Sequence, residues 1–150
     1  MNNLVYLAGE IHTQWRNEIT GLCEALELDI QFSSPITNHK VSDDIGKDIT
    51  GVEDKSFWND YKSARLNQAR NKVLLEKSNV VIVRFGERYK QWNSAFDAGF
   101  AVAHNKPLVT SHDECLDHAL KEIDSAAVSV TRNVEQVVKS LAYICCGRTL

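Results

Sequence analysis

NVVIVRFGERYKQWNSAFDAGFAVAHNKPLVT, residues 79–110, holds two strand-like runs on either side of a helix-length segment. The β-branched run at 79–84 is the most continuous in the chain, and such runs are typical of a central strand that is covered on both faces. Residues 95–104 have the length and apolar content of a helix, and residues 106–110 form the next strand-like run. This order predicts two parallel strands joined by a helix.

The same alternation extends toward both ends of the chain. We predict further strands at 4–8, 29–33 and 127–130, and helices at 15–28, 57–77, 116–124 and 134–144. Such an order favours one three-layer α/β domain over residues 1–150, built on a five-stranded parallel sheet. We expect the flavodoxin-like (Rossmannoid) strand order 2-1-3-4-5.

Residues 34–56 interrupt this alternation. The segment shows little hydrophobic periodicity, is rich in acidic residues and is too long for an ordinary connection. Two interpretations fit, a lid over a substrate or a solvated insertion. Because the segment follows the second predicted strand on the ligand-binding side of the sheet, we favour the lid.

Composition excludes several classes of function. A formal net charge of -3, without a cluster of basic and aromatic residues, does not favour binding to a nucleic-acid polymer. No apolar run reaches membrane-spanning length and no basic leader precedes the first strand, so we expect a cytoplasmic protein without membrane contact. A glycine-rich phosphate loop of the G-x-G-x-x-G or G-x-x-x-x-G-K type is missing, which argues against dinucleotide redox chemistry and NTP hydrolysis.

Metal and disulfide chemistry are not indicated either. The four cysteines match neither a zinc ribbon nor C-x-x-C, so reduced thiols are expected. His112, Cys115 and His118 could suggest metal ligands, but with their acidic neighbours they straddle a predicted helix start, where Asp and Glu are common. We therefore expect no metal and no organic cofactor.

Ligands of open parallel sheets bind beyond the carboxyl ends of the strands, which here are the loops at 9–13 and 85–93. Gly9 could let backbone approach a sugar or phosphate, and Glu10 or His12 could contact the ligand. Arg84 ends the predicted central strand and could pair with an anionic ligand or with Asp97. Trp58 could stack on a nucleobase or pack in the core.

Asp97 interrupts an otherwise apolar helix. Ser94-Ala-Phe-Asp97 has the S-x-x-D form of a capping box, in which Asp97 would serve only the helix start. Alternatively, the helix N-terminus lowers the pKa of Asp97 and leaves the carboxylate free as a nucleophile that traps an anomeric carbon. The topology places Tyr6 close enough to hold that carboxylate with its phenolic hydroxyl.

Several stretches resemble a known family. Residues 5–9, 71–83 and 91–107 are similar to the nucleoside 2-deoxyribosyltransferases, and AGEIHT, FWNDYKSA and DHALKEID extend the resemblance to the YtoQ-type branch of that superfamily over nearly the whole chain. The resemblance implies a flavodoxin-like fold, a homo-oligomer whose neighbouring subunit completes each pocket, and chemistry on a nucleoside N-glycosidic bond without metal or cofactor. It places Asp97 at the nucleophile and Tyr6 at the tyrosine that orients it.

Two acids of that family are replaced here by Asn71 and Gln91. Neither amide donates a titratable proton, so Glu10 or His12 would have to substitute. Further substrate contacts are expected from the residues just before Asp97, namely Asn93 and Ser94. Two functions follow, an enzyme that cleaves or exchanges the N-glycosidic bond of a nucleoside or nucleotide, and a non-catalytic nucleotide-binding or regulatory module.

Overall fold

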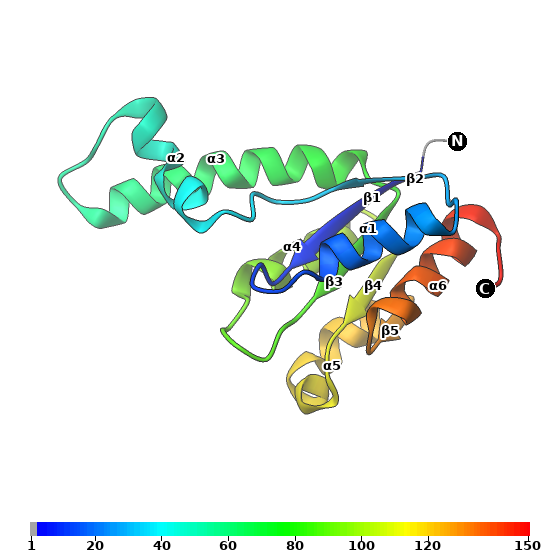
Figure 1. Ribbon diagram of the computed structural model, residues 1–150. Helices are drawn as coiled ribbons and strands as arrows, with labels where there is room; N and C mark the ends of the chain where they lie inside the picture. The colour runs from blue at the N-terminus through cyan, green and yellow to red at the C-terminus, as the bar shows by residue number, and fades with distance from the viewer. Residues whose placement is uncertain (1–2) are drawn as a thin grey trace.

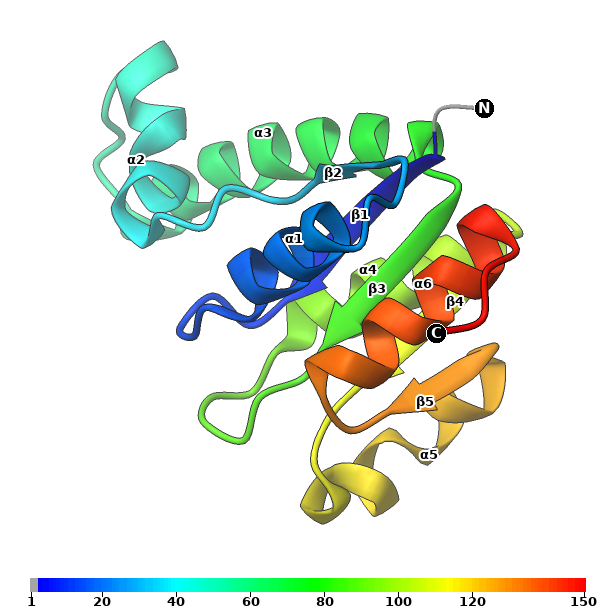
Figure 2. The same ribbon diagram turned by 45° about the vertical axis from the view of Figure 1, so that its right-hand side comes forward.

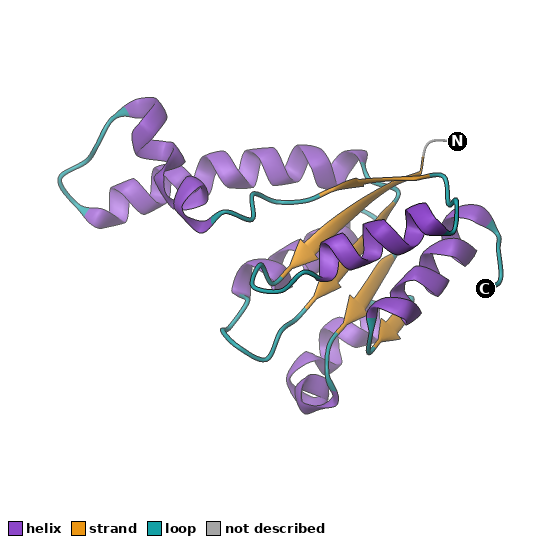
Figure 3. Cartoon of the chain, in the orientation of Figure 1, coloured by secondary structure: helices purple, strands orange, loops and turns teal. Residues whose placement is uncertain are grey.

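A parallel sheet organises the protein in the computed structural model, which describes residues 3–150 (Figures 1 and 3). Its strands are β1 (Asn3–Gly9), β2 (Ile30–Ser33), β3 (Val80–Arg84), β4 (Leu108–Ser111) and β5 (Ser129–Thr131). They are all parallel and follow the order β2-β1-β3-β4-β5, which confirms the predicted fold class.

Helices cover both faces of the sheet. They are α1 (Trp15–Ala25), α2 (His39–Thr50), α3 (Ser56–Lys77), α4 (Trp92–Ala103), α5 (Asp117–Ala126), with the short 3-10 turn η1 (Glu114–Leu116) before it, and α6 (Val134–Cys146). Figure 2 shows α1 and α6 on one face and α3, α4 and α5 behind the other. Within residues 3–150, no helix is long and apolar enough to cross a membrane.

Two apolar cores result, one on each face. Leu7 and Ile82 point toward Ile19 of α1 and Leu141 of α6. On the other face, Val81 and Val83 pack with the helices α3, α4 and α5 through a cluster that includes Leu75, Ala98, Ala101 and Leu120. Residues 80–83 are at most 2% exposed, so β3 is covered on both faces as its β-branched run predicted.

The start of α4 differs from the prediction. The helix begins at Trp92, three residues earlier than expected, and Gln91 occupies the N-cap position without a side-chain capping bond. Ser94 and Asp97 therefore both lie inside the helix, and the predicted capping box is wrong. The Asp97 carboxyl is consequently not used to cap the start of its own helix.

A second difference is helix α2, which lies in the 34–56 segment, where no helix was predicted. Asn38 caps it by accepting a bond from the Val41 N–H at 3.1 Å, and Gly46 is its one buried residue among those described. The helix packs on α3 through small and polar groups: the Ser63 hydroxyl accepts from the Gly46 N–H at 3.0 Å and donates to the Asp43 carbonyl at 2.5 Å. Val41, Ile45 and Ile49 do recur along α2 at a spacing of four residues, but Val41 and Ile49 are exposed, so this apolar stripe is not what holds α2 to α3.

Gly46→Ala should loosen α2 from α3. A Cβ at position 46 would lie 2.5 Å from both the Lys62 Cβ and the Ser63 backbone nitrogen, so the helices must separate, at a cost of about 1–3 kcal/mol. Hydrogen exchange should report faster exchange across 39–50. Gly99→Ala is the matched control, because a Cβ there meets no atom within 4 Å. Unchanged protection of α2 in Gly46→Ala would contradict this packing.

Candidate active site

Two adjoining clefts open at the carboxyl ends of the strands. The first, of about 350 Å³, lies between Asp97 and the α2–α3 pair, and the second, of about 570 Å³, lies beside the 85–93 loop. Five lining residues belong to both clefts: Gly9, Ile11, His39, Asn93 and Ser94. A single ligand could therefore extend from one cleft into the other.

Asp97 lies on the buried face of α4 and lines the first cleft. Asp97 is 6% exposed, and desolvation by this burial raises the pKa of its carboxyl to about 7. The predicted lowering of the pKa is wrong because Asp97 follows Trp92, the first residue of the helix, by five positions. The field of a helix N-terminus fades within the first turn.

Tyr6 lies in the middle of β1 and is fully buried. Among the residues that the structure describes, its hydroxyl has no hydrogen-bond partner, so the predicted bond to Asp97 is not formed. Burial raises the pKa of this phenol, and the nearby charge of Asp97 raises it further. A neutral phenol beside an unsatisfied carboxyl remains available as a donor when either group moves or a ligand arrives.

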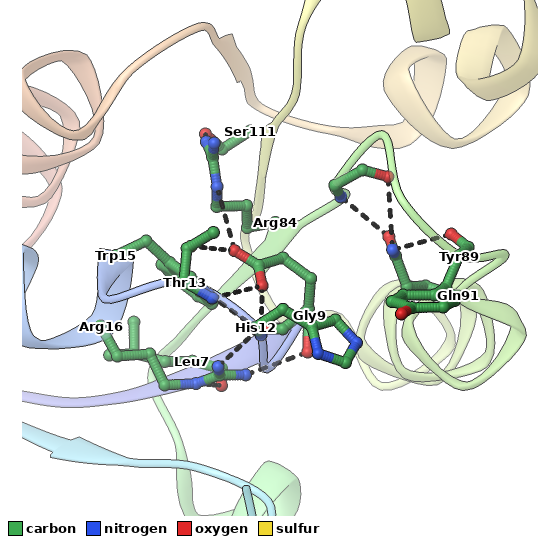
Figure 4. A network of polar contacts seen from close by, with 12 residues as sticks. Leu7, Gly9, His12, Thr13, Trp15, Arg16, Arg84, Tyr89, Gln91 and Ser111 are labelled. Atoms are coloured by element: carbon green, nitrogen blue, oxygen red, sulfur yellow. Dashed lines mark hydrogen bonds and ion pairs between the residues drawn. The ribbon is translucent and has the colours of Figure 1, made fainter.

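Glu10 is held as a carboxylate by its own loop (Figure 4). It accepts from the His12 N–H at 2.6 Å, the Thr13 N–H at 3.0 Å and the Thr13 hydroxyl, and its Oε1 lies 3.7 Å from the Nε of Arg84. Burial alone would raise the pKa of Glu10, but these hydrogen bonds and Arg84 outweigh it and lower the pKa. This arrangement suits Glu10 to fixing the loop rather than to donating a proton.

Helix α1 holds the same loop from the other side. Arg16 donates to the carbonyls of Leu7, Gly9 and Glu10 at 3.0, 3.1 and 2.7 Å, and Trp15 Nε1 donates to the Glu10 carbonyl at 2.9 Å (Figure 4). Burial lowers the pKa of Arg16 to about 10, which still leaves it charged at neutral pH. The floor shared by the two clefts is therefore rigidly held.

Gly9 is required by the neighbouring strand. It has a φ of +128°, and a Cβ there would lie 2.2 Å from the Arg84 carbonyl oxygen. The structure shows this close approach to β3, and Gly9 also lines both clefts, so its predicted contact with a ligand stays a prediction. Arg84 pairs with Glu10 and contacts the Ser111 hydroxyl at 3.3 Å, rather than Asp97.

The two amides that replace family acids have different environments. Asn71 lines the first cleft, and its Oδ1 is buried without a hydrogen-bond partner in the described part of the chain. Gln91 uses its side chain to hold the 85–93 loop, through the Gly86 N–H at 2.8 Å and the Tyr89 carbonyl at 2.8 Å (Figure 4). Asn71 thus faces the first cleft with a free acceptor, whereas Gln91 is occupied.

The remaining predicted residues are distributed unevenly. Asn93 and Ser94 line both clefts. His12 lines the second cleft, where its ring centre lies 4.6 Å from that of Tyr89 and 5.9 Å from that of His39. Trp58 lines neither cleft, because it lies half-exposed near the start of α3 against Phe57 and Tyr61.

Sequence reasoning missed the residues that α2 and the start of α3 bring to the first cleft. His39, Asp43, Asp60 and Asn67 line it, and Asn67 donates to the Ser42 carbonyl at 2.9 Å. Asn38 just before α2 and Gly51 just after it, with a φ of +87°, are the cap signals that could have revealed the helix.

Metal ligation is not supported by the groups present. Within residues 3–150, no three His, Cys, Asp or Glu side chains are grouped so as to hold a metal ion. His112 is fully buried, and its Nε2 lies 2.9 Å from Asp124 Oδ2.

Comparisons with known proteins agree with this fold. The family model described as nucleoside 2-deoxyribosyltransferase YtoQ matches residues 6–145. A Bacillus subtilis (strain 168) protein described as uncharacterized protein YtoQ is 44% identical over 144 residues, covering 96% of this chain and 97% of its own.

Two solved structures are similar in fold. A 2-deoxyribosyltransferase from Bacillus psychrosaccharolyticus superposes with a TM-score of 0.53 at 13% identity, covering 90% of both chains. A conserved protein from Enterococcus faecalis V583 superposes with a TM-score of 0.63 at 14% identity, covering 96% of this chain and 99% of the other.

Proposed function

The chain belongs to the nucleoside 2-deoxyribosyltransferase YtoQ family, and we propose that it cleaves or exchanges the N-glycosidic bond of a nucleoside or nucleotide. The observation that carries the proposal is the carboxyl of Asp97, which is buried at the wall of a cleft and whose pKa is raised by desolvation alone. A carboxylate with few solvating partners is a stronger nucleophile than one that water surrounds.

The reaction runs in two balanced steps. A carboxylate oxygen of Asp97 attacks the anomeric carbon while the bond from that carbon to the base nitrogen breaks, and the departing base keeps the bond's electron pair and takes a proton from solvent water. Water or a second base then attacks the same carbon and gives up a proton to solvent, and the ester oxygen returns to Asp97 as a carboxylate. We propose that the Tyr6 hydroxyl, which is near enough for the charge of Asp97 to raise its pKa, donates a hydrogen bond to that carboxylate once a bound ligand moves either group.

The first cleft suits an uncharged, hydroxyl-rich part of the substrate. Asn71 offers an acceptor without a partner, and Gln68 and Asp60 add polar groups from the same helix. An unpaired buried acceptor favours a ligand that brings an N–H or O–H group. We assign Asn71 to contact with the base or the sugar, in place of the family's acid.

The segment 34–56 is proposed to cover this part of the substrate. Pro35, Ile36, Ser42 and Asp43 line the first cleft from it. Since Gly46 and Ser63 fix α2 to α3, the cover is a wall that moves with α3 rather than an independent flap.

A homo-oligomer is also proposed. Phe57, Trp58 and Tyr61 form an exposed aromatic cluster on α3, with exposures of 63, 48 and 43%. Exposed aromatic groups of this kind are enriched at protein interfaces. Light scattering on the protein as it elutes from a size-exclusion column measures the molar mass of the assembly.

The enzymatic proposal is tested by incubating the protein with a panel of nucleosides and 5′-monophosphates and measuring released base by chromatography. We expect release from at least one substrate, and a loss of about 10³-fold or more in Asp97→Ala, as for removal of other catalytic nucleophiles. Asp48→Ala is a matched control, because Asp48 is an exposed aspartate that lines neither cleft, and it should keep base release unchanged.

Failure of the whole panel would contradict catalysis and favour the alternative, a non-catalytic nucleotide-binding or regulatory module. Its support is the replacement of two family acids by Asn71 and Gln91. Thermal stabilisation by a nucleotide that persists in Asp97→Asn, without any product, would establish that function instead.

A further inference from the structure

We propose that the second cleft binds a phosphate group, so that the substrate is a nucleoside 5′-monophosphate rather than a free nucleoside. The inference rests on the proposed function, because it takes the sugar to lie against Asp97 in the first cleft. It is carried by the unequal distribution of charge between the two clefts.

The first cleft disfavours a phosphate. Three carboxyl groups line it, from Asp43, Asp60 and Asp97, and its lining contains neither lysine nor arginine. A phosphate dianion there would meet like charges with no lysine or arginine in the lining to offset them. The anionic end of a substrate must therefore lie elsewhere.

The second cleft has the opposite character. Its lining includes His12, His39 and Lys90, and its one carboxylate, Glu10, is already neutralised by Arg84 and by the donors of its own loop. Lys90 Nζ lies 5.8 Å from the centre of the Trp92 ring, at the same wall. His39 also has Asp43 at 3.7 Å, so Lys90 is the basic group on which the test depends.

Backbone and hydroxyl donors converge on the same cleft. Trp92, Asn93 and Ser94 form the first turn of the 12-residue helix α4, and all three line the cleft. No side chain caps this turn, since Gln91 is occupied by the 85–93 loop. The N–H groups of a first turn lack partners within their helix and favour an anion.

Ser94 gives the second, independent observation. It is 5% exposed, and within residues 3–150 its hydroxyl forms no hydrogen bond, although it lines both clefts. The hydroxyl oxygen is not among the fully enclosed atoms without a partner, so it is open to the clefts, where a phosphate oxygen can accept its hydrogen bond.

The spacing of the clefts fits a nucleotide. Ser94 precedes Asp97 by three residues on the buried face of α4. Positions three residues apart on a helix are neighbours, about 5–6 Å between their Cβ atoms. That separation is comparable to the width of a pentose with its 5′ carbon, so a phosphate at Ser94 leaves the anomeric carbon at Asp97.

The test measures binding by calorimetry with a nucleoside, its 5′-monophosphate and inorganic phosphate. It uses Asp97→Asn, to suppress turnover, with and without Lys90→Gln. We expect the monophosphate to bind at least about tenfold tighter than the nucleoside, which corresponds to about 1.4 kcal/mol. Lys90→Gln should remove most of this preference and leave nucleoside affinity unchanged. Lys121→Gln, on exposed α5, is the matched control and should keep the preference.

Equal binding of nucleoside and monophosphate, or a preference that Lys90→Gln does not alter, overturns the inference. Inorganic phosphate that binds through Lys90 while the monophosphate gains nothing assigns the site to free phosphate and also overturns it. Turnover separates this inference from the proposed function. A Lys90-dependent preference for the monophosphate without base release supports the phosphate site and contradicts the enzymatic function. Base release from nucleosides without such a preference supports the enzymatic function and contradicts the phosphate site.

Discussion

Asp97→Asn is expected to stabilise the protein at pH 8 while it abolishes base release. Burial raises the pKa of this carboxyl from 3.8 to about 7, so between those values the folded state binds a proton that the unfolded chain has lost. Stability therefore falls as the pH rises through that window. A shift of about three units corresponds to roughly 4 kcal/mol, because each unit is worth 1.36 kcal/mol.

Urea unfolding at pH 4 and pH 8 measures this effect. The stability of Asp97→Asn relative to the unmodified protein should increase by about 3–4 kcal/mol between the two pH values. Asp117→Asn is the control, since the hydrogen bond from Arg132 lowers the pKa of Asp117 below its ordinary value of 3.8, so its effect on stability should vary little between pH 4 and pH 8. If the difference in unfolding free energy between Asp97→Asn and the unmodified protein does not vary with pH, this carboxyl is solvated in the folded protein.

The same pKa governs the rate. Only the carboxylate attacks, so base release should increase with pH up to about 7 and then level off. Active sites often lower the stability of the folded protein when their groups are in the reactive form. Gain of stability together with loss of activity in one variant is thus the expected signature of a catalytic Asp97.

Gly9→Ala is expected to destabilise the protein by about 3–5 kcal/mol. The φ of +128° at Gly9 is unfavourable for any residue with a Cβ, and the added carbon would lie 2.2 Å from the carbonyl oxygen of Arg84 and 2.7 Å from its nitrogen. These are backbone atoms of the buried strand β3, so they cannot move aside as a flexible side chain can. The loss would be a large part of the stability of a domain of this size.

Urea unfolding again gives the free energy, and resistance to proteolysis gives a second measurement if Gly9→Ala yields little folded protein. Gly21→Ala is the matched control, because Gly21 lies on the exposed side of α1 with no atom within 4 Å of an added Cβ. That substitution should stabilise by about 0.5–1 kcal/mol through helix propensity. Equal stability of Gly9→Ala and the unmodified protein would contradict the close approach of β1 and β3.

The sheet could be predicted from the sequence because its signals are local. Each strand is a short apolar run, the β-branched run at 79–84 identifies the central strand, and helix-length segments separate the runs. The strand order then follows from the few topologies that such an alternation allows. Recognition of the family came from the same continuous stretches.

Features that depend on contacts between distant segments could not be predicted. Helix α2 has Val41, Ile45 and Ile49 at helical spacing, but it is held to α3 by Gly46 against Ser63, a contact between small groups that the sequence pattern does not reveal. The pKa of Asp97 was predicted from helix position, but burial by other elements decides it. The ion pair of Glu10 with Arg84 also joins distant segments, whereas the predicted ligand contact of Glu10 or His12, which both line the second cleft, stays a prediction.

The attachment of the 9–13 loop to β3 has a consequence for protein engineering. Gly9 contacts the Arg84 backbone, the Glu10 N–H donates to the Arg84 carbonyl at 3.0 Å, and the Glu10 carboxylate faces the Arg84 side chain. Two segments more than seventy positions apart thus form one transplantable module. Chimeras between relatives should exchange the β1 loop and the end of β3 together, and libraries that vary only one of them would mostly sample misfolded sequences.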